Sequence, residues 1–264
     1  MTPYPSLPAG RNRTGAWTRL LAFLFAACAA PLALPGSEPA PPRGFAGFQA
    51  LDPALLPALE PVPSVPGRPR VLLLGDSISI AYTLAVRAHL EGRATVHRPP
   101  ENCGSTAYGL ERLADWLGTG PWAVIHFNFG LHDLKYLDAQ GNYVSPAEGR
   151  QVASPEEYGR NLRALVRRLR ATGAALIFAT TTPVPAGTKG RVEGGEAAYN
   201  EVALAVMREA GVTVDDLHAF VRGRLAGLQL PHNVHFTPAG SDELAREVAR
   251  HITAALDHEL PRHH

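Results

Sequence analysis

The chain has 264 residues and a formal net charge of +1, which suits one sizeable domain with appendages. A near-neutral charge gives no general reason to expect a nucleic acid or an anionic membrane surface as partner. Its two cysteines are Cys28 and Cys103. Removal of an N-terminal signal would leave only Cys103, so we expect the fold to rest on its core and not on a disulfide.

The N-terminal segment is typical of an export signal. Arg11 and Arg13 precede a short apolar run, residues 20–30, which is followed by proline and small residues. The run is shorter than the roughly 20 residues of a comfortable membrane span. The residues before Cys28 loosely resemble a bacterial lipoprotein cleavage box; the alternatives are an ordinary cleaved signal and an uncleaved anchor. We therefore expect an exported protein that is periplasmic, secreted or anchored to a membrane through this segment.

Composition sets the expected boundaries. Residues 1–36 are assigned to the signal or anchor and residues 37–68 to a linker rich in Pro and Ala. Residues 69–258 form one expected folded domain, and residues 259–264 a tail. Within the linker, residues 51–59 could form a short turn of helix that packs on the domain.

The domain alternates strand and helix patterns, which indicates a parallel sheet covered on both faces. The expected strands are residues 71–74, 94–97, 122–129, 175–180 and 212–214. The expected helices are residues 80–90, 110–117, 197–210, one that follows Ser154 and one that begins near Thr237. Ser154 as N-cap, Pro155 at the first helical position and Glu157 two positions later are a helix-start signature.

Ser77 lies in the turn after the first strand, in the segment RVLLLGDSIS. Ligands of parallel α/β sheets bind at the carboxyl ends of strands, so Ser77 could be a nucleophile, a phosphate ligand or a helix N-cap. A serine nucleophile needs a nearby base and donors aimed at the developing oxyanion. His235, before the last helix, is the candidate base, and the backbone N–H groups of Ser77 and Gly104 are the candidate donors.

Four short blocks carry a resemblance to a known family. They are G-D-S at residues 75–77, Gly104 within ENCGST, G-L-H-D at residues 130–133 and VHFTPAG from Val234. In order and spacing they resemble the blocks of the SGNH (GDSL-type) hydrolase family, and the likeness spans almost all of residues 70–256.

The resemblance implies a flavodoxin-like three-layer α/β/α sandwich, here with a five-stranded parallel sheet. It also implies cleavage of esters, thioesters or O-acetyl groups on sugars, with no metal and no cofactor. The family's nucleophile maps to Ser77, its oxyanion glycine to Gly104 and its base to His235. The expected partner is accordingly a small-molecule or carbohydrate ester.

Two positions depart from the family pattern. The third block normally holds an asparagine that donates to the oxyanion, where this chain has His132. An imidazole can also donate an N–H, and Asn128, at the end of the same strand, is a substitute donor. The last block normally holds an aspartate that orients the base, where this chain has His232, followed by Asn233.

The missing aspartate bears on the activity, because exchanging the Asp of a serine-protease triad for Asn costs about 10⁴-fold in rate. His232 itself, a backbone carbonyl or Asp216 could orient His235 instead, although Asp216 also suits a helix N-cap. The two departures keep two alternatives open. One is an attenuated SGNH-fold binding protein of the cell envelope, and the other is an acyltransferase that uses the same serine.

The remaining polar residues have simpler expected roles. His132 and His235 with Asp133 could suggest a zinc site, but the block order explains these positions better. Asp133 is expected to tie down its loop through backbone N–H groups, and His126 to be a core residue. The long connection of residues 130–153 follows the third block, so we expect it to shape the pocket, with Lys135 and Tyr136 near the rim.

Overall fold

The computed structural model describes residues 53–259. The expected signal, residues 1–36, most of the linker and the tail from residue 260 lie outside the described residues. The part of the linker that is described contains the expected short helical turn, as η1 (Pro53–Leu55) followed by α1 (Leu56–Leu59). Ala58 of α1 is buried, and α1 packs against α2 (Ser77–His89).

A five-stranded parallel sheet forms the centre of the domain. In spatial order its strands are β2 (Thr95–His97), β1 (Arg70–Leu74), β3 (Val124–Phe127), β6 (Ala175–Ala179) and β7 (Thr213–Asp215). The order is that of flavodoxin-like folds, in which the chain leaves β1 toward one edge and returns to build the other. The switch point lies between β1 and β3. The fold class expected from the sequence is therefore confirmed.

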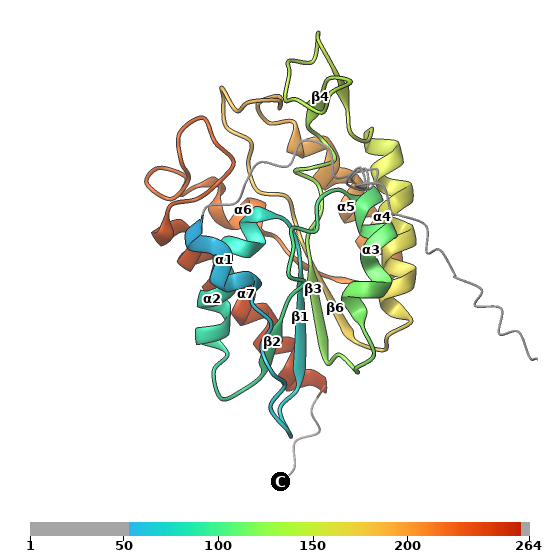
Figure 1. The fold of residues 1–264 in the computed structure, drawn as a ribbon, viewed down its shortest axis with the longest axis vertical. Helices are drawn as coiled ribbons and strands as arrows, with labels where there is room; N and C mark the ends of the chain where they lie inside the picture. The colour runs from blue at the N-terminus through green and yellow to red at the C-terminus, as the bar shows by residue number, and fades with distance from the viewer. Residues whose placement is uncertain (1–52, 260–264) are drawn as a thin grey trace, which may run out of the picture. The chain divides into compact units, whose positions relative to one another are not determined.

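Helices cover both faces of the sheet (Figure 1). On one face, α2 packs along α7 (Pro238–Glu259), which also contacts β3, β6 and β7. On the other face, α4 (Pro155–Arg170) lies between α3 (Thr106–Leu117) and α5 (Glu196–Ala210). Apolar side chains from both layers and from the nearly continuous apolar strands form one core, as expected for a sheet buried on both sides.

Caps explain where the helices begin. The Ser154 hydroxyl accepts from the Glu157 N–H, so α4 begins as expected. Helix α2 begins three residues earlier than expected because the Asp76 carboxylate accepts from the Ile78 N–H and is the N-cap. The N-cap interpretation of Ser77 is therefore wrong, and Ser77 is the first residue of α2. Helix α3 likewise begins early, capped by Ser105.

The turn between β1 and α2 leaves no room for a side chain at Gly75. A Cβ there would lie 2.6 Å from the Ser79 Cβ and 3.0 Å from its Oγ. The turn is also tied from outside, because the Gly75 carbonyl accepts from the Cys103 N–H and from the buried Arg98 guanidinium. These contacts fix the backbone that carries Ser77.

We expect Gly75→Ala to lower the free energy of unfolding by roughly 1–3 kcal/mol, because α2 must move to relieve the overlap. Urea denaturation measures this change. Gly223→Ala is the matched control: Gly223 has a φ of −84°, and a Cβ there meets nothing within 4 Å. An unfolding midpoint for Gly75→Ala equal to that of Gly223→Ala would contradict the expectation.

The sequence patterns missed three short elements. Residues 130–153 contain the antiparallel pair β4 (Tyr136–Leu137) and β5 (Arg150–Gln151), and α6 (Leu217–Arg222) follows β7. Two-residue strands carry too little periodicity to be recognised. Within the part of the chain that the structure describes, no helix combines the length and apolar character needed to cross a membrane.

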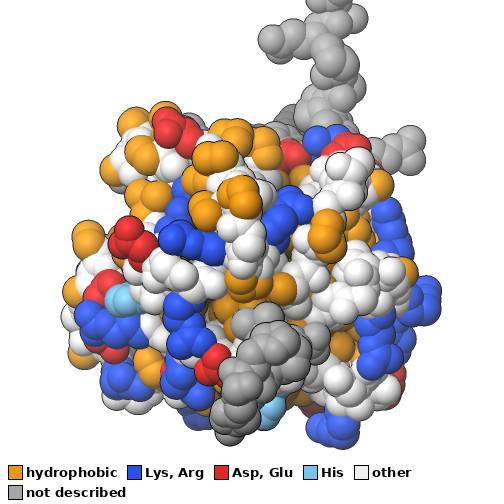
Figure 2. Space-filling model, turned by 90° about the horizontal axis from the view of Figure 1, so that it is seen from below, with side chains coloured by type: hydrophobic (Ala, Val, Ile, Leu, Met, Phe, Trp, Pro, Cys, Tyr) orange, Lys and Arg blue, Asp and Glu red, His pale blue; other side chains and the backbone are white. Residues whose placement is uncertain are grey.

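The face seen from below carries no single kind of side chain (Figure 2). Lys and Arg side chains are spread among hydrophobic and uncharged ones, and neither kind forms a continuous surface in this view.

Candidate active site

Ser77 and His235 lie together although 158 positions separate them in the sequence. The Ser77 Oγ is 2.8 Å from the His235 Nε2. Ser77 is placed by the first turn of α2, and His235 by the loop that leads into α7. Because α2 and α7 pack side by side, the two residues meet beyond the carboxyl end of β1. The sequence-based pairing of these two residues is therefore present in the geometry.

Asn233 holds the other side of the His235 ring. Its Oδ1 lies 2.7 Å from the His235 Nδ1 and also accepts, at 3.1 Å, from the backbone N–H of His235. A backbone N–H can only donate, which identifies the Asn233 atom as the carbonyl oxygen. The Nδ1 must then carry the ring proton, and the Nε2 lone pair is left toward the Ser77 hydroxyl. This is the tautomer that a general base requires.

His232 and Asp216, which the sequence offered as residues that orient His235, make no such contact in the structure. The His232 ring is exposed, and its Nδ1 contacts the Ala186 carbonyl at 2.8 Å. Its φ of 55° turns the backbone so that the neighbouring Asn233 faces the base. Asp216 caps α6 by accepting from the Ala219 N–H and also accepts from Thr180. Those two expectations were wrong.

Burial favours a neutral imidazole at His235. Burial lowers the pKa of His235, the Arg191 charge acts in the same direction, and the Asp76 charge opposes them. Asp76 lies under the nucleophile turn, and burial raises its own pKa despite the hydrogen bond from Ile78. His235 therefore stays unprotonated to a lower pH than an exposed histidine, so the base remains available in mildly acidic solution.

The backbone N–H of Gly104, the other expected oxyanion donor, is engaged in a hydrogen bond. It donates to the Asn102 Oδ1 at 3.0 Å, and Asn102 lines the same cavity as Ser77. The φ of Gly104 is 61°, a left-handed conformation that favours glycine. An oxyanion held by this N–H would take the place that the Asn102 oxygen occupies here.

His132 is buried and lines the cavity. Its Nδ1 lies 3.1 Å from the Lys135 Nζ. Burial lowers the pKa of Lys135 to about 7. In its ammonium form the lysine can only donate, and Nδ1 is then the acceptor and the ring proton lies on Nε2. Burial lowers the pKa of His132 well below its usual value, and the Lys135 charge adds to this effect. His132 is therefore a neutral imidazole with one N–H, the form that could replace an asparagine donor.

Asn128 does not fill the donor role. Its Nδ2 donates to the Ala179 carbonyl at 2.8 Å, and the same amide reaches the Thr180 carbonyl at 3.4 Å. It is not among the residues that line the cavity of Ser77. Asn128 thus joins the ends of β3 and β6, and the expectation that it could act on the oxyanion was wrong.

A cavity of about 760 Å³ opens beside Ser77. Its lining combines apolar side chains with several polar groups near the nucleophile: Ser77, Asn102, His132, Tyr143, Arg191 and His235. This volume is far larger than an acetyl group, and it lies within the range of small-molecule sites. The cavity can therefore accept a sizeable alcohol or acyl part.

The long connection of residues 130–153 contributes to this cavity through Leu131, His132 and Tyr143. Lys135 is fully buried, Tyr136 pairs with Gln151 in the β4–β5 ribbon, and neither lines the cavity, so the expectation that these two border the rim was wrong. Asp133 behaves as expected, since its carboxylate accepts from the N–H and hydroxyl of Thr106. The connection therefore shapes the cavity as expected, and Tyr143 is a lining residue that the sequence did not single out.

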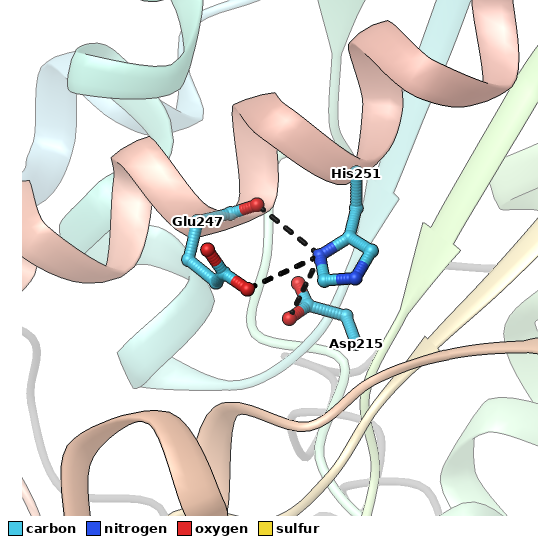
Figure 3. Close-up of side chains that lie close together, drawn as sticks. All are labelled: Asp215, Glu247 and His251. Carbon is cyan, nitrogen blue, oxygen red and sulfur yellow. Dashed lines mark hydrogen bonds and ion pairs between the residues drawn. The ribbon is translucent and has the colours of Figure 1, made fainter.

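A second group of titratable side chains lies away from the cavity, between β7 and α7 (Figure 3). One ligand-type atom of each of Asp215, Glu247 and His251 lies within 4.8 Å of the others. Asp215 accepts from His126 at 3.0 Å on one oxygen and pairs with His251 at 3.2 Å on the other. Glu247 also pairs with Arg250. These contacts account for the group as an ion-pair network, and His126 is a core residue within it.

Two further residues of the site were missed by sequence reasoning. Asn233 could have been found, because Asn two positions before a residue often accepts its backbone N–H in an Asx turn. Arg191 carried no such signal: it lies in an irregular segment, and only the folding of residues 183–195 beside the third block brings it to the cavity. Asn233 acts on the base, and Arg191 places a positive charge in the cavity lining.

The family model for the GDSL-like lipase/acylhydrolase family matches residues 73–242. The chain belongs to this family, and it is an esterase of the SGNH type. No curated protein matches this chain in sequence.

Solved structures share the fold. An acetyl xylan esterase, AlAXEase, aligns with a TM-score of 0.56 at 12% identity, over 69% of this chain and 99% of that one. A lipase/acylhydrolase from Enterococcus faecalis gives 0.56 at 19%, over 70% and 96%. Axe2, an acetylxylan esterase from Geobacillus stearothermophilus, gives 0.55 at 18%, over 70% and 94%. At these identities the likeness shows the common fold.

Proposed function

We propose that this esterase is exported and hydrolyses an acyl or O-acetyl ester, with a carbohydrate as the favoured alcohol part, through a Ser77–His235 pair. The observation that carries the proposal is the 2.8 Å contact between the Ser77 Oγ and the His235 Nε2, with Asn233 on the opposite ring nitrogen. Export is supported by the basic and apolar pattern of residues 11–30. The carbohydrate part is supported by the acetylxylan esterases of the same fold.

The reaction follows from the positions of these groups. The Ser77 Oγ attacks the ester carbonyl carbon while the His235 Nε2 takes the hydroxyl proton. The negative charge moves to the carbonyl oxygen, where the N–H groups of Ser77 and Gly104 and the Nε2–H of His132 can donate. The alcohol leaves with the proton from His235, and an acyl-enzyme remains. Water then gives its proton to His235, releases the acid and restores Ser77.

The test is labelling with a fluorophosphonate probe, read by intact mass. We expect one adduct on the wild type and none on Ser77→Ala, because only an activated serine attacks the phosphorus. Hydrolysis of a short acetyl ester should be lost in the same variant. Folded wild-type protein that forms no adduct would refute the serine mechanism and favour a binding protein.

Labelling does not separate hydrolysis from acyl transfer, so the product must be identified. An acetyl ester incubated with a sugar acceptor in excess is expected to give free acetate as the main product. Acetylated sugar as the main product would show that the same serine serves an acyltransferase.

A further inference from the structure

We infer that the cavity binds a carboxylate on its ester substrate and that Arg191 is the residue that holds it. The inference rests on the proposed function and names the substrate class more closely: esters of acidic molecules, such as O-acetylated uronic acids or half-esters of dicarboxylic acids. Both share a carboxylate a few bonds away from the ester.

Arg191 is fixed beside the nucleophile. It lines the same cavity as Ser77 and His235. Its Nε donates to the Leu131 carbonyl at 3.0 Å, and its guanidinium lies 5.5 Å from the Tyr143 ring centre. Leu131 belongs to the third family block. The side chain is therefore held in one place by contacts to the residues next to the candidate oxyanion donor His132.

Within the described residues, the charge of Arg191 has no carboxylate ion-pair partner. Among residues 53–259, no Asp or Glu forms an ion pair with it; Tyr143 and the more distant Asp76 are its main favourable neighbours. Burial lowers the pKa of Arg191, and its charge in turn lowers the pKa of both His235 and His132. A half-buried cation without an anion is costly unless a ligand supplies one.

The rest of the lining leaves this positive charge uncompensated. Exposed Lys189 adds a second cation to the cavity. In the described part of the chain, Asp242 is the one acid that lines the cavity, and it already pairs with Arg246 and His89. The electrostatic potential in the cavity therefore favours binding of an anion and disfavours binding of a cation.

A carboxylate matches the guanidinium better than a doubly charged group does. A guanidinium has five N–H donors in a planar fork, and the contact to Leu131 uses one. A planar, singly charged carboxylate can take two of the others side by side. One fixed guanidinium therefore fits a monovalent anion without a cluster of basic residues.

The experiment compares charged and neutral esters of the same shape. One pair places the charge on the acyl side, as para-nitrophenyl succinate and para-nitrophenyl succinamate. The other places it on the alcohol side, as O-acetylated methyl glucuronide and its glucuronamide. We expect wild type to prefer the carboxylate in at least one pair by roughly 30-fold in kcat/KM. The pair that shows the preference identifies the side on which the carboxylate lies.

The variants attribute the preference to Arg191. Arg191→Gln should bring the ratio in that pair close to one, and Arg191→Lys should keep part of it because the charge remains. Arg167→Gln, on the exposed side of α4, removes the same charge far from the lining and should keep the ratio. A wild-type ratio near one in both pairs, or an unchanged ratio in Arg191→Gln, would overturn the inference.

A binding measurement separates this inference from the proposed chemistry. Calorimetry on Ser77→Ala, titrated with succinate and with methyl glucuronide, should detect binding that Arg191→Gln removes and added salt weakens. If neutral esters are cleaved but neither carboxylate binds, the inference fails and the proposed function stands. If a carboxylate binds through Arg191 but Ser77 forms no adduct, the proposed function fails and the anion site stands.

Discussion

His235→Ala is expected to lower kcat by about 10⁴-fold while leaving KM close to the wild-type value. The imidazole takes the Ser77 proton in the transition state, so its loss removes an interaction that the bound substrate does not use. Steady-state kinetics on a short acetyl ester measures both constants. A variant that keeps more than about a tenth of the kcat would show that another group activates Ser77.

His232→Ala is the matched comparison, because it removes an imidazole from the same loop. The His232 ring contacts the Ala186 carbonyl and not the nucleophile. We therefore expect this variant to keep most of its kcat, with any effect confined to KM because the ring borders the cavity. A loss in kcat as large as that of His235→Ala would reverse the assignment of the base.

Asn233→Ala is expected to lower kcat/KM by about 10²-fold, because the His235 ring loses the contact that fixes its tautomer and orientation. Asn233→Asp should restore activity at neutral pH, since a carboxylate oxygen accepts the same two N–H groups and also stabilises the imidazolium. Full activity in Asn233→Ala would show that the 2.7 Å contact has no catalytic role.

Asn233→Asp is also expected to change the pH dependence of activity relative to wild type. The base acts only when neutral, so activity falls as the pH drops through the pKa of His235. Burial lowers this pKa below its usual value of 6.5, and the acid limb of kcat/KM for wild type should lie below that pH. In Asn233→Asp the added negative charge raises the pKa of His235, and the limb should move to higher pH. If the acid limb of kcat/KM lay at the same pH in wild type and Asn233→Asp, the expected effect of the added charge on His235 would be contradicted.

The fold could be predicted from the sequence because the three central strands are mostly apolar and alternate with helical patterns. What the patterns misplaced were the starts of α2 and α3. Asp76 and Ser105 cap these helices, and several neighbouring residues, Ser77 among them, are equally good cap types, so the sequence alone does not say which one is the cap. Short β4 and β5 lie below the length at which alternation is informative.

Some residues of the site could be predicted from the sequence and others could not. Ser77, Gly104 and His235 belong to short local blocks, so their positions could be read from the order of the blocks. Other contacts around the site join residues that are far apart in the fold or in different elements. Lys135 contacts His132, Asn128 donates to the end of β6, and the Leu131 carbonyl accepts from Arg191. Such contacts depend on backbone direction and burial, which spacing along the chain does not contain. His232 is an example. Its backbone is in the left-handed conformation, and the neighbouring Asn233, not His232, contacts the His235 ring.

The wide sequence separation of Ser77 and His235 has a consequence for biogenesis. The nucleophile belongs to the first strand–helix unit of the domain, while its base is held by the loop before the last helix. Helix α7 must therefore dock against α2 before the two atoms can meet (Figure 1). A nascent chain carries the serine without its partner and cannot attack esters. Hydrolytic capacity would then arise only when nearly the whole domain has emerged and closed on itself.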